Sequence, residues 1–156
     1  MADAIIDRLS PSDTETIAHL YNSVFRPAHD AAWFDRRLQG RHNPLIQVAR
    51  LGSDAVGFYL GLELKPSTHC GWLLGVVSDF RRAGIGTQLM RAAVDWAASE
   101  GYRYMRFEVP NSVRHSLHFG IAEGFDIVGI RWDGDLTTNL VIFEKALHEH
   151  HGHEAD

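Results

Sequence analysis

Two arginines and two glycines in one short stretch have the residue types and spacing of a phosphate-binding site. Arg81 and Arg82 are followed by Gly84 and Gly86, in the order Arg-Arg-Ala-Gly-Ile-Gly. Glycines leave backbone amides uncovered, and arginines add positive charge beside them. If a helix begins at these glycines, its first amides have no partner within the helix, and the helix dipole adds partial positive charge. The stretch therefore predicts a cradle for an anion.

The segments on either side predict the elements that would hold this cradle. Residues 70–77 form an apolar run that ends abruptly, which predicts a strand. After Gly84, apolar residues recur at helical spacing from Ile85 to Ala97, and Gly101 is a suitable residue to end the helix. Strand, glycine-containing turn and helix are together the physical form of a phosphate cradle.

The rest of the chain predicts further strands and helices without an internal boundary. In chain order they are a strand at 4–9, a helix begun by a Ser12–Glu15 capping box and ended by Pro27, a helix at 31–38, strands at 45–51 and 55–64, then the strand and helix above, a strand at 102–109, a helix at 113–123, and strands at 125–132 and 139–146. Residues 1–147 therefore predict one domain, and residues 148–156 a polar, histidine-rich tail.

Composition excludes several classes of protein. A net charge of −5 argues against nucleic-acid binding, and a single cysteine, Cys70, excludes an internal disulfide framework. No apolar run approaches the roughly 20 residues of a membrane span, and the N-terminal residues lack the features of a signal peptide. We therefore expect a cytoplasmic protein without a membrane partner. We predict no metal site, because no turn or apolar anchor fixes the tail histidines His148, His150, His151 and His153.

The Arg81-x-x-Gly84-x-Gly86 pattern, placed after an apolar strand and at the start of a helix, resembles the acetyl-CoA signature of the GNAT family of N-acetyltransferases. The order of elements over residues 4–146 is similar to that fold, and Gly124-Phe125 is similar to the Gly-Phe before its sixth strand. The resemblance implies a mixed α/β fold with a twisted, mostly antiparallel sheet of six to seven strands flanked by about four helices. Its fourth and fifth strands, here 70–77 and 102–109, would run parallel and splay apart.

The resemblance implies acetyl-CoA as co-substrate, with its pantetheine arm lying in the gap between the splayed strands. The implied cofactor-binding residues are Gly75, Val76, Val77, Arg81, Arg82, Ala83, Gly84, Ile85, Gly86, Thr87 and Asn111. The asparagine common in the family would fall on Val113, so Asn111 is close but out of register. A bulge at Gly71 or Gly75 and a ladder stop at Pro110 are the devices that the sequence offers for splaying the strands.

The chemistry implied is direct attack of a primary amine on the thioester in a ternary complex. Counting back from Gly124-Phe125, Glu108 falls on the position of a general base, and Glu63 is a rival. The same count places Gly120 where some relatives have a tyrosine acid. Water is an alternative proton donor, and the side-chain alternatives are Ser116, His118 and His115.

We therefore expect an N-acetyltransferase acting on a small-molecule or peptide amine. The acceptor pocket should come from residues 26–44, 64–70 and 133–138. Homodimers are common in the family, so the resemblance leaves a homodimer open. The missing tyrosine keeps a second hypothesis open, that the chain is a non-catalytic acyl-CoA binding or sensing module on the same fold.

Overall fold

A computed structural model describes residues 3–147, which form one seven-stranded sheet and four α-helices. The predicted histidine tail lies outside the described residues. The strands are β1 (Ile5–Arg8), β2 (Leu45–Leu51), β3 (Asp54–Lys65), β4 (Thr68–Val76), β5 (Tyr104–Pro110), β6 (Asp126–Asp133) and β7 (Thr138–Ala146), and the helices are α1 (Thr14–Val24), α2 (Ala31–Leu38), α3 (Ile85–Ser99) and α4 (Arg114–Ala122). The order across the sheet is β1-β2-β3-β4-β5-β7-β6. No helix within residues 3–147 has the length and apolar content needed to cross a membrane.

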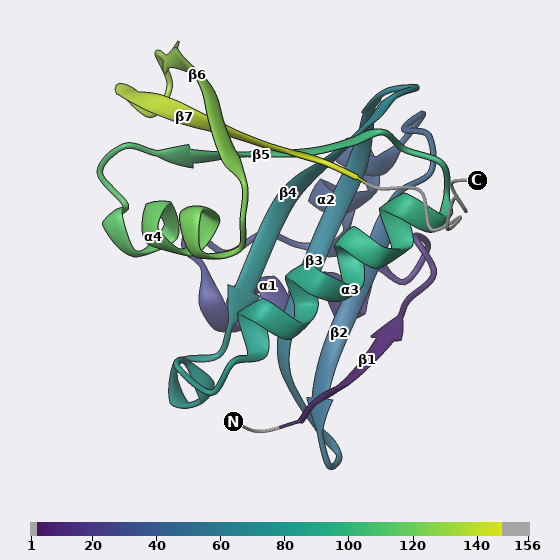
Figure 1. The fold of residues 1–156 in the computed structure, drawn as a ribbon. Coiled ribbons are helices and arrows are strands. Elements are labelled where there is room, and N and C mark those ends of the chain that lie inside the picture. Colours follow the sequence, from purple (N-terminus) through teal and green to yellow (C-terminus); the bar gives the residue numbers. More distant parts are fainter. Residues whose placement is uncertain (1–2, 148–156) are drawn as a thin grey trace, which may run out of the picture.

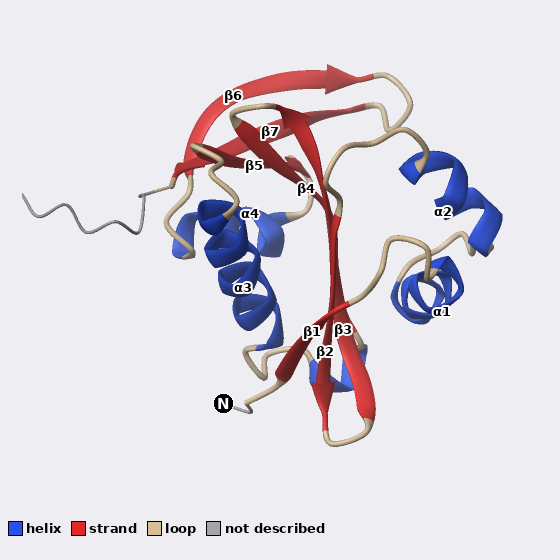
Figure 2. Ribbon diagram, turned by 90° about the vertical axis from the view of Figure 1, so that its right-hand side faces the viewer, coloured by secondary structure: helices blue, strands red, loops and turns tan. Residues whose placement is uncertain are grey.

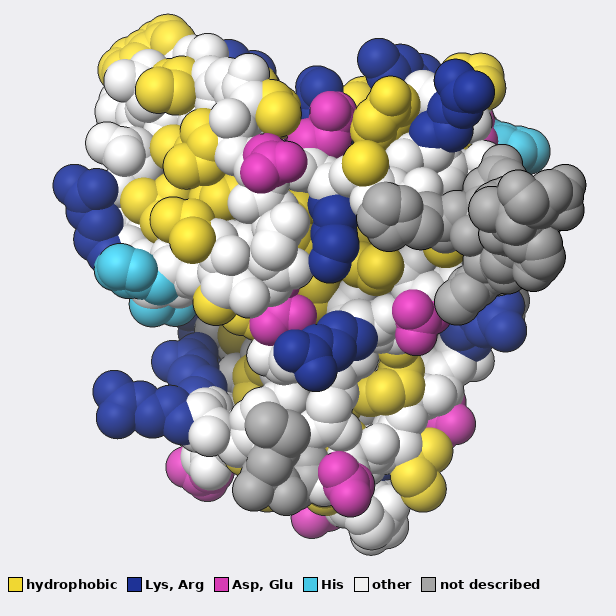
Figure 3. Space-filling model, viewed as in Figure 1, with side chains coloured by type: hydrophobic (Ala, Val, Ile, Leu, Met, Phe, Trp, Pro, Cys, Tyr) yellow, Lys and Arg dark blue, Asp and Glu magenta, His cyan; other side chains and the backbone are white. Residues whose placement is uncertain are grey.

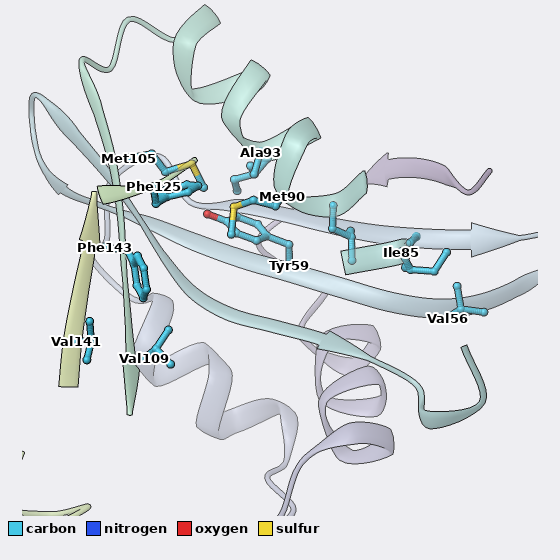
Figure 4. Packing of buried hydrophobic residues seen from close by; sticks show 13 residues of the cluster. Val56, Tyr59, Ile85, Met90, Ala93, Met105, Val109, Phe125, Val141 and Phe143 are labelled. Carbon is cyan, nitrogen blue, oxygen red and sulfur yellow. The ribbon is translucent and has the colours of Figure 1, made fainter. Parts of the chain in front are cut away.

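The helices cover both faces of the sheet, α3 and α4 on one side and α1 and α2 on the other (Figure 2). Each face has its own buried apolar cluster. Leu89 and Ala93 of α3 belong to the cluster on the first face. Figure 4 shows Ala93 in this cluster together with Tyr59 and Phe143. Phe34 of α2 belongs to the cluster on the second face. The predicted mixed α/β class, with parallel fourth and fifth strands, is confirmed.

Strands β4 and β5 pair for only four residues. Their parallel register runs from Thr68 opposite Tyr104 to Gly71 opposite Phe107. Beyond that point β4 continues beside β3 and β5 continues beside β7, so the two strands diverge (Figure 1). The β3–β4 register shifts between Gly71 and Leu73, which makes Trp72 the extra residue of a bulge. A bulge was predicted at Gly71 or Gly75, and it lies next to Gly71.

The start of α1 differs from its prediction. Asp13, not Ser12, is the N-cap, and its carboxylate accepts a hydrogen bond from the Thr16 amide at 3.4 Å. The Ser12 hydroxyl lies 2.8 Å from the Ser10 hydroxyl instead. The predicted Ser12–Glu15 capping box is therefore wrong, because in the turn before the helix the Ser12 hydroxyl contacts Ser10 and not the helix amides.

The two edges of the sheet expose different side chains. At one edge β1 is only four residues long. At the other, β6 carries exposed apolar side chains, Ile127, Val128, Ile130 and Trp132. Figure 3 shows apolar side chains gathered over this part of the molecule. An apolar edge strand is the part of a sheet most open to association, so β6 is the surface on which to look for the homodimer that the resemblance leaves open.

A buried polar pair ties β3 to β4 just before the strands diverge. The Tyr59 hydroxyl and His69 Nε2 are 2.7 Å apart, and both residues are essentially inaccessible. Gly61 and Gly71 flank the pair, and a side chain at Gly61 would collide with the His69 ring. Burial lowers the pKa of His69 from 6.5 to about 4, so the imidazole is neutral in the folded protein at pH 7.

Replacing His69 with glutamine should remove part of the acid sensitivity of folding. The unfolded chain binds a proton at His69 below pH 6.5, whereas the folded chain does so only near pH 4. Protonation of His69 therefore leaves the free energy of unfolding nearly unchanged above pH 6.5. It lowers that free energy as the pH drops toward 4, by about 2 kcal/mol between pH 7 and pH 4.5. Urea unfolding at those two pH values should show a loss smaller by that amount in His69→Gln. The exposed His19 is the control, and an equal effect of His19→Gln would contradict the assignment.

Candidate functional site

The turn between β4 and α3 presents uncovered backbone amides. Gly84 precedes α3 with a φ of 82°, in the left-handed region that suits glycine. The helix begins with the Gln88 amide donating to the Gly84 carbonyl at 3.1 Å. Within residues 3–147, the amides of Ile85, Gly86 and Thr87 have no hydrogen-bond partner. Free amides at a helix N-terminus, together with the helix dipole, are suited to a phosphate group.

Basic side chains border these amides. A short 3₁₀ helix, Ser78–Phe80, reverses the chain after β4. Arg82 has a φ of 70°, a conformation that is uncommon outside glycine and that concentrates at functional sites. Arg81 and Arg82 are both exposed, and Figure 3 shows basic side chains projecting at this corner of the molecule. The geometry suits an anion, while the identity of the anion stays a prediction.

The predicted cofactor residues at the end of β4 have different surroundings. The Val77 amide donates to a carbonyl of β3 at 2.9 Å, so it is committed to the sheet. By strand alternation Val76 turns its backbone groups the other way, and its carbonyl accepts from Arg81 Nε at 3.2 Å. A Cβ at Gly75 would lie 2.7 Å from Phe58 Cε1. Gly75 is therefore required by core packing, and Val76 borders the opening between the strands.

Glu108, the predicted base, is the first residue of β5 beyond its pairing with β4. Met105 and Phe107 pack on the side of α3 and α4, so strand alternation directs Glu108 toward the side of α1 and α2. Its Oε2 accepts a hydrogen bond from Arg131 Nε of β6 at 2.7 Å. The Glu108 and Arg131 side chains are 27% and 52% exposed, so a molecule in solution has access to both.

The segment predicted to contact the acceptor, residues 26–44, is held firmly at its start. The Asn22 side chain donates to the His29 carbonyl at 2.8 Å and accepts from the His29 amide at 2.9 Å. The His29 ring stacks on Trp33 with centroids 3.8 Å apart. Trp33 in turn lies 5.8 Å from Trp72, at the β4 bulge. His29, Trp33 and Trp72 therefore form an aromatic wall on the same side of the sheet as Glu108.

The other candidates lie elsewhere or lack a distinguishing contact. Glu63 accepts from the Tyr102 hydroxyl at 2.8 Å, in the part of the sheet where β4 and β5 are still paired. Asn111 is exposed, and its backbone amide donates to the Asn139 carbonyl of β7 at 2.9 Å. In α4, Ser116 is half-buried and His118 is exposed. The roles of these residues stay predictions.

Gly120 is buried against the aromatic core. A Cβ at this position would lie 2.8 Å from Phe143 Cε1 and 2.9 Å from its Cζ. Phe143 stacks on Phe107 of β5 with centroids 5.0 Å apart, so it has little freedom to move. The position of the expected tyrosine acid is therefore closed to any side chain unless Phe143 shifts.

A covalent route through the cysteine is disfavoured by its environment. Cys70 lies on β4 opposite Arg106. Burial, and then the nearby charge of Glu108, raises the pKa of the Cys70 thiol to about 11. The thiol is therefore protonated at neutral pH and is a weak nucleophile. Across residues 3–147, no three His, Cys, Asp or Glu side chains are grouped to hold a metal ion.

Arg131 was not anticipated from the sequence. Its contact with Glu108 crosses two strand interfaces, β5 with β7 and β7 with β6, and the second contains a register shift between Ile127 and Gly129. No local pattern signals such a contact. The sequence signal available was an arginine inside an otherwise apolar strand segment.

A family model matches this chain over residues 14–120, and its description is the acetyltransferase (GNAT) family. The match covers the predicted cradle, β5 and most of α4. No curated protein sequence matches the chain well enough to count as a relative.

Solved structures agree with the chain over nearly its whole length. A ribosomal-protein alanine N-acetyltransferase from Escherichia coli is 16% identical, with a TM-score of 0.79 and 99% of each chain covered. A Bacillus subtilis acetyltransferase in complex with CoA is 21% identical, with a TM-score of 0.78, covering 94% of this chain and all of that one. An Elizabethkingia anophelis GNAT acetyltransferase with acetyl-CoA bound is 18% identical, with a TM-score of 0.74 and the same coverage. At these identities the likeness shows the fold.

Adding one methyl group at Gly120 should destabilise the protein. Gly120→Ala places its Cβ within 3 Å of the Phe143 ring, and such overpacking typically costs about 1–3 kcal/mol. Denaturant unfolding measures the change. Gly86→Ala is the matched control, because its Cβ would have no atom closer than 3.8 Å. A Gly120→Ala protein as stable as Gly86→Ala would contradict the closed position.

Proposed function

The chain belongs to the GNAT family of acetyltransferases, and on that premise we propose that it transfers the acetyl group of acetyl-CoA to a primary amine by direct attack in a ternary complex. One observation carries the proposal. The opening between β4 and β5 begins beside Glu108 and ends beside the uncovered amides of α3. A long ligand with a thioester at one end and a pyrophosphate along its length fits that arrangement.

In this proposal the cofactor lies in the opening between the strands, along the edge of β4 that faces β5. The uncovered amides of Ile85, Gly86 and Thr87 hold the pyrophosphate, and Arg81 and Arg82 add positive charge. Val76 offers its backbone to the pantetheine arm, which requires Arg81 to release the Val76 carbonyl. The similar structures from Elizabethkingia anophelis and Bacillus subtilis contain acetyl-CoA and CoA, which supports this choice of ligand.

Glu108 takes one proton from the incoming ammonium group, because only the neutral amine is nucleophilic. The amine nitrogen then forms a bond to the thioester carbon, and the carbon–sulfur bond breaks to release the CoA thiolate. The second proton lost by the nitrogen neutralises the thiolate. Water, Ser116 and His118 are the candidate carriers of that proton, since Gly120 offers none.

The closed position at Gly120 also supports a second candidate function, a non-catalytic module that binds acyl-CoA. The two functions differ in one measurement, the release of free thiol from acetyl-CoA with a panel of amines. The panel should include amino acids, polyamines, aminoglycosides and short peptides. Thiol release that requires an amine supports the enzyme. Tight acetyl-CoA binding without thiol release across the panel supports the module and contradicts the enzyme.

Gly86→Glu should abolish acetyl-CoA binding while the protein stays folded. The new carboxylate would face the pyrophosphate across uncovered amides, so affinity should fall by roughly 100-fold or more. Isothermal titration calorimetry measures the affinity, and circular dichroism reports on folding. Ser99→Glu adds the same charge to the exposed end of the same helix and should bind normally. Unchanged binding by Gly86→Glu would rule out the cradle.

Glu108→Gln tests the base. The turnover number should fall by roughly 100-fold at neutral pH, and the pH–rate profile should lose its acidic limb. Affinity for acetyl-CoA should change little. Glu63→Gln is the matched control, since Glu63 lies in the fully paired part of the sheet and should keep the wild-type profile. A Glu108→Gln enzyme with an unaltered profile would remove Glu108 from this role.

A further inference from the structure

Two ion pairs lie on the same face of the sheet, and they differ in the number of hydrogen bonds and in the exposure of the arginine. Arg106 donates to Glu144 through both Nε and Nη2, at 3.3 and 2.8 Å. Both side chains of this pair are about three-quarters buried, so a ligand has little access to its arginine. Arg131 donates to Glu108 through Nε alone.

The Arg131–Glu108 pair therefore keeps spare groups on both members. Among residues 3–147, neither terminal nitrogen of the Arg131 guanidinium has a partner, and Oε1 of Glu108 has none either. An arginine offers five N–H donors in a planar fork, and a carboxylate has about four acceptor sites. One cation and one anion are thus adjacent, accessible and only partly satisfied at the point where β4 and β5 diverge.

Such a pair gives little net electrostatic attraction for a simple amine. Its ammonium group is attracted to Glu108 and repelled by Arg131, which is in contact with that same carboxylate. A molecule with one positive and one negative group close together interacts favourably with both members. The ammonium meets Glu108, the carboxylate meets the free side of the Arg131 fork, and each of the four charges has opposite neighbours.

Resting on the function proposed above, we propose that the acceptor is a free amino acid, held by its ammonium group at Glu108 and by its carboxylate at Arg131. The contact between Glu108 and Arg131 sets the spacing, because the two ligand charges must then lie within a few ångströms of each other. An α-amino acid has that spacing. A peptide N-terminus and a lysine side chain lack the carboxylate.

The charge arrangement also agrees with the chemistry. When Glu108 takes the proton of the ammonium group it loses its charge, and its attraction for Arg131 weakens. Arg131 then remains paired with the carboxylate of the acceptor, which holds the amine in place during attack. Arg131 is thus a positioning residue in this proposal, and Glu108 is the group that exchanges a proton with the substrate.

The test compares free amino acids with their α-amides in the thiol-release assay, using the full chain. The amide keeps the amine and the side chain but removes the negative charge. We expect kcat/KM for the best amino acid to exceed that for its amide by roughly 100-fold, the worth of a charge-assisted bidentate contact. Amides or lysine peptides used as well as free amino acids would overturn the proposal.

Arg131→Gln identifies the residue responsible. It should raise KM for the amino acid by roughly 10- to 100-fold and change kinetics with the amide by less than about threefold. Arg131→Lys, which keeps the charge but not the fork, should fall between. Arg50→Gln, which breaks an ion pair with Asp7 near the opposite edge of the sheet, should behave as wild type. Equal losses for acid and amide in Arg131→Gln would mean a structural role only and would overturn the assignment.

These outcomes are separable from failure of the proposed function. If no amine releases thiol although acetyl-CoA binds, the enzyme itself is contradicted and the acceptor proposal falls with it. If amines release thiol without a preference for a carboxylate, the enzyme stands and the amino-acid proposal fails.

Discussion

The structure depends on how early the pairing between β4 and β5 stops. Four residue pairs join them, and the bulge at Trp72 then turns β4 away. Neither strand is left alone, because β4 keeps β3 and β5 keeps β7. The facing backbone groups beyond Gly71 still need partners. The Val76 carbonyl accepts a hydrogen bond from Arg81 Nε. The opening is thus a gap in the hydrogen bonding between β4 and β5. A chain that contains amide groups, such as the pantetheine arm proposed above, is suited to bind there.

The interruption is stable because the sheet is held tightly on both sides of it. Tyr59 and His69 fill the space left by Gly61 and Gly71 just before the divergence. After it, the aromatic stack of Phe107 and Phe143 holds β5 to β7. The Gln47 side chain donates to the Leu89 carbonyl at 3.0 Å and fixes α3 across the sheet. Well-packed elements therefore surround the opening, and α3, whose N-terminus forms the cradle, is held in position beside it.

Local signals predicted most elements, and what they missed was one helix cap and one contact between distant strands. The bounds of α2 and β2 follow directly from apolar spacing and from the glycines that come after them. The fold was predicted from a resemblance based on Arg81, Gly84 and Gly86, on the order of the elements and on Gly124-Phe125. The cap of α1 was misassigned by one residue, because competing serine hydroxyls in a turn are decided by geometry. The contact of Arg131 with Glu108 depends on strand register, which no local pattern encodes.

If residues 26–44 line the acceptor pocket as the sequence predicts, the hydrogen bonds of Asn22 to the backbone of His29 affect how an acceptor is selected. A wall that is already ordered loses little conformational entropy when a ligand arrives, so most of the contact energy remains available as affinity. The same stiffness limits adaptation, since a wall of stacked aromatic rings cannot reshape itself around acceptors of different size. Tight discrimination among similar molecules, rather than breadth, is the behaviour that such a wall favours.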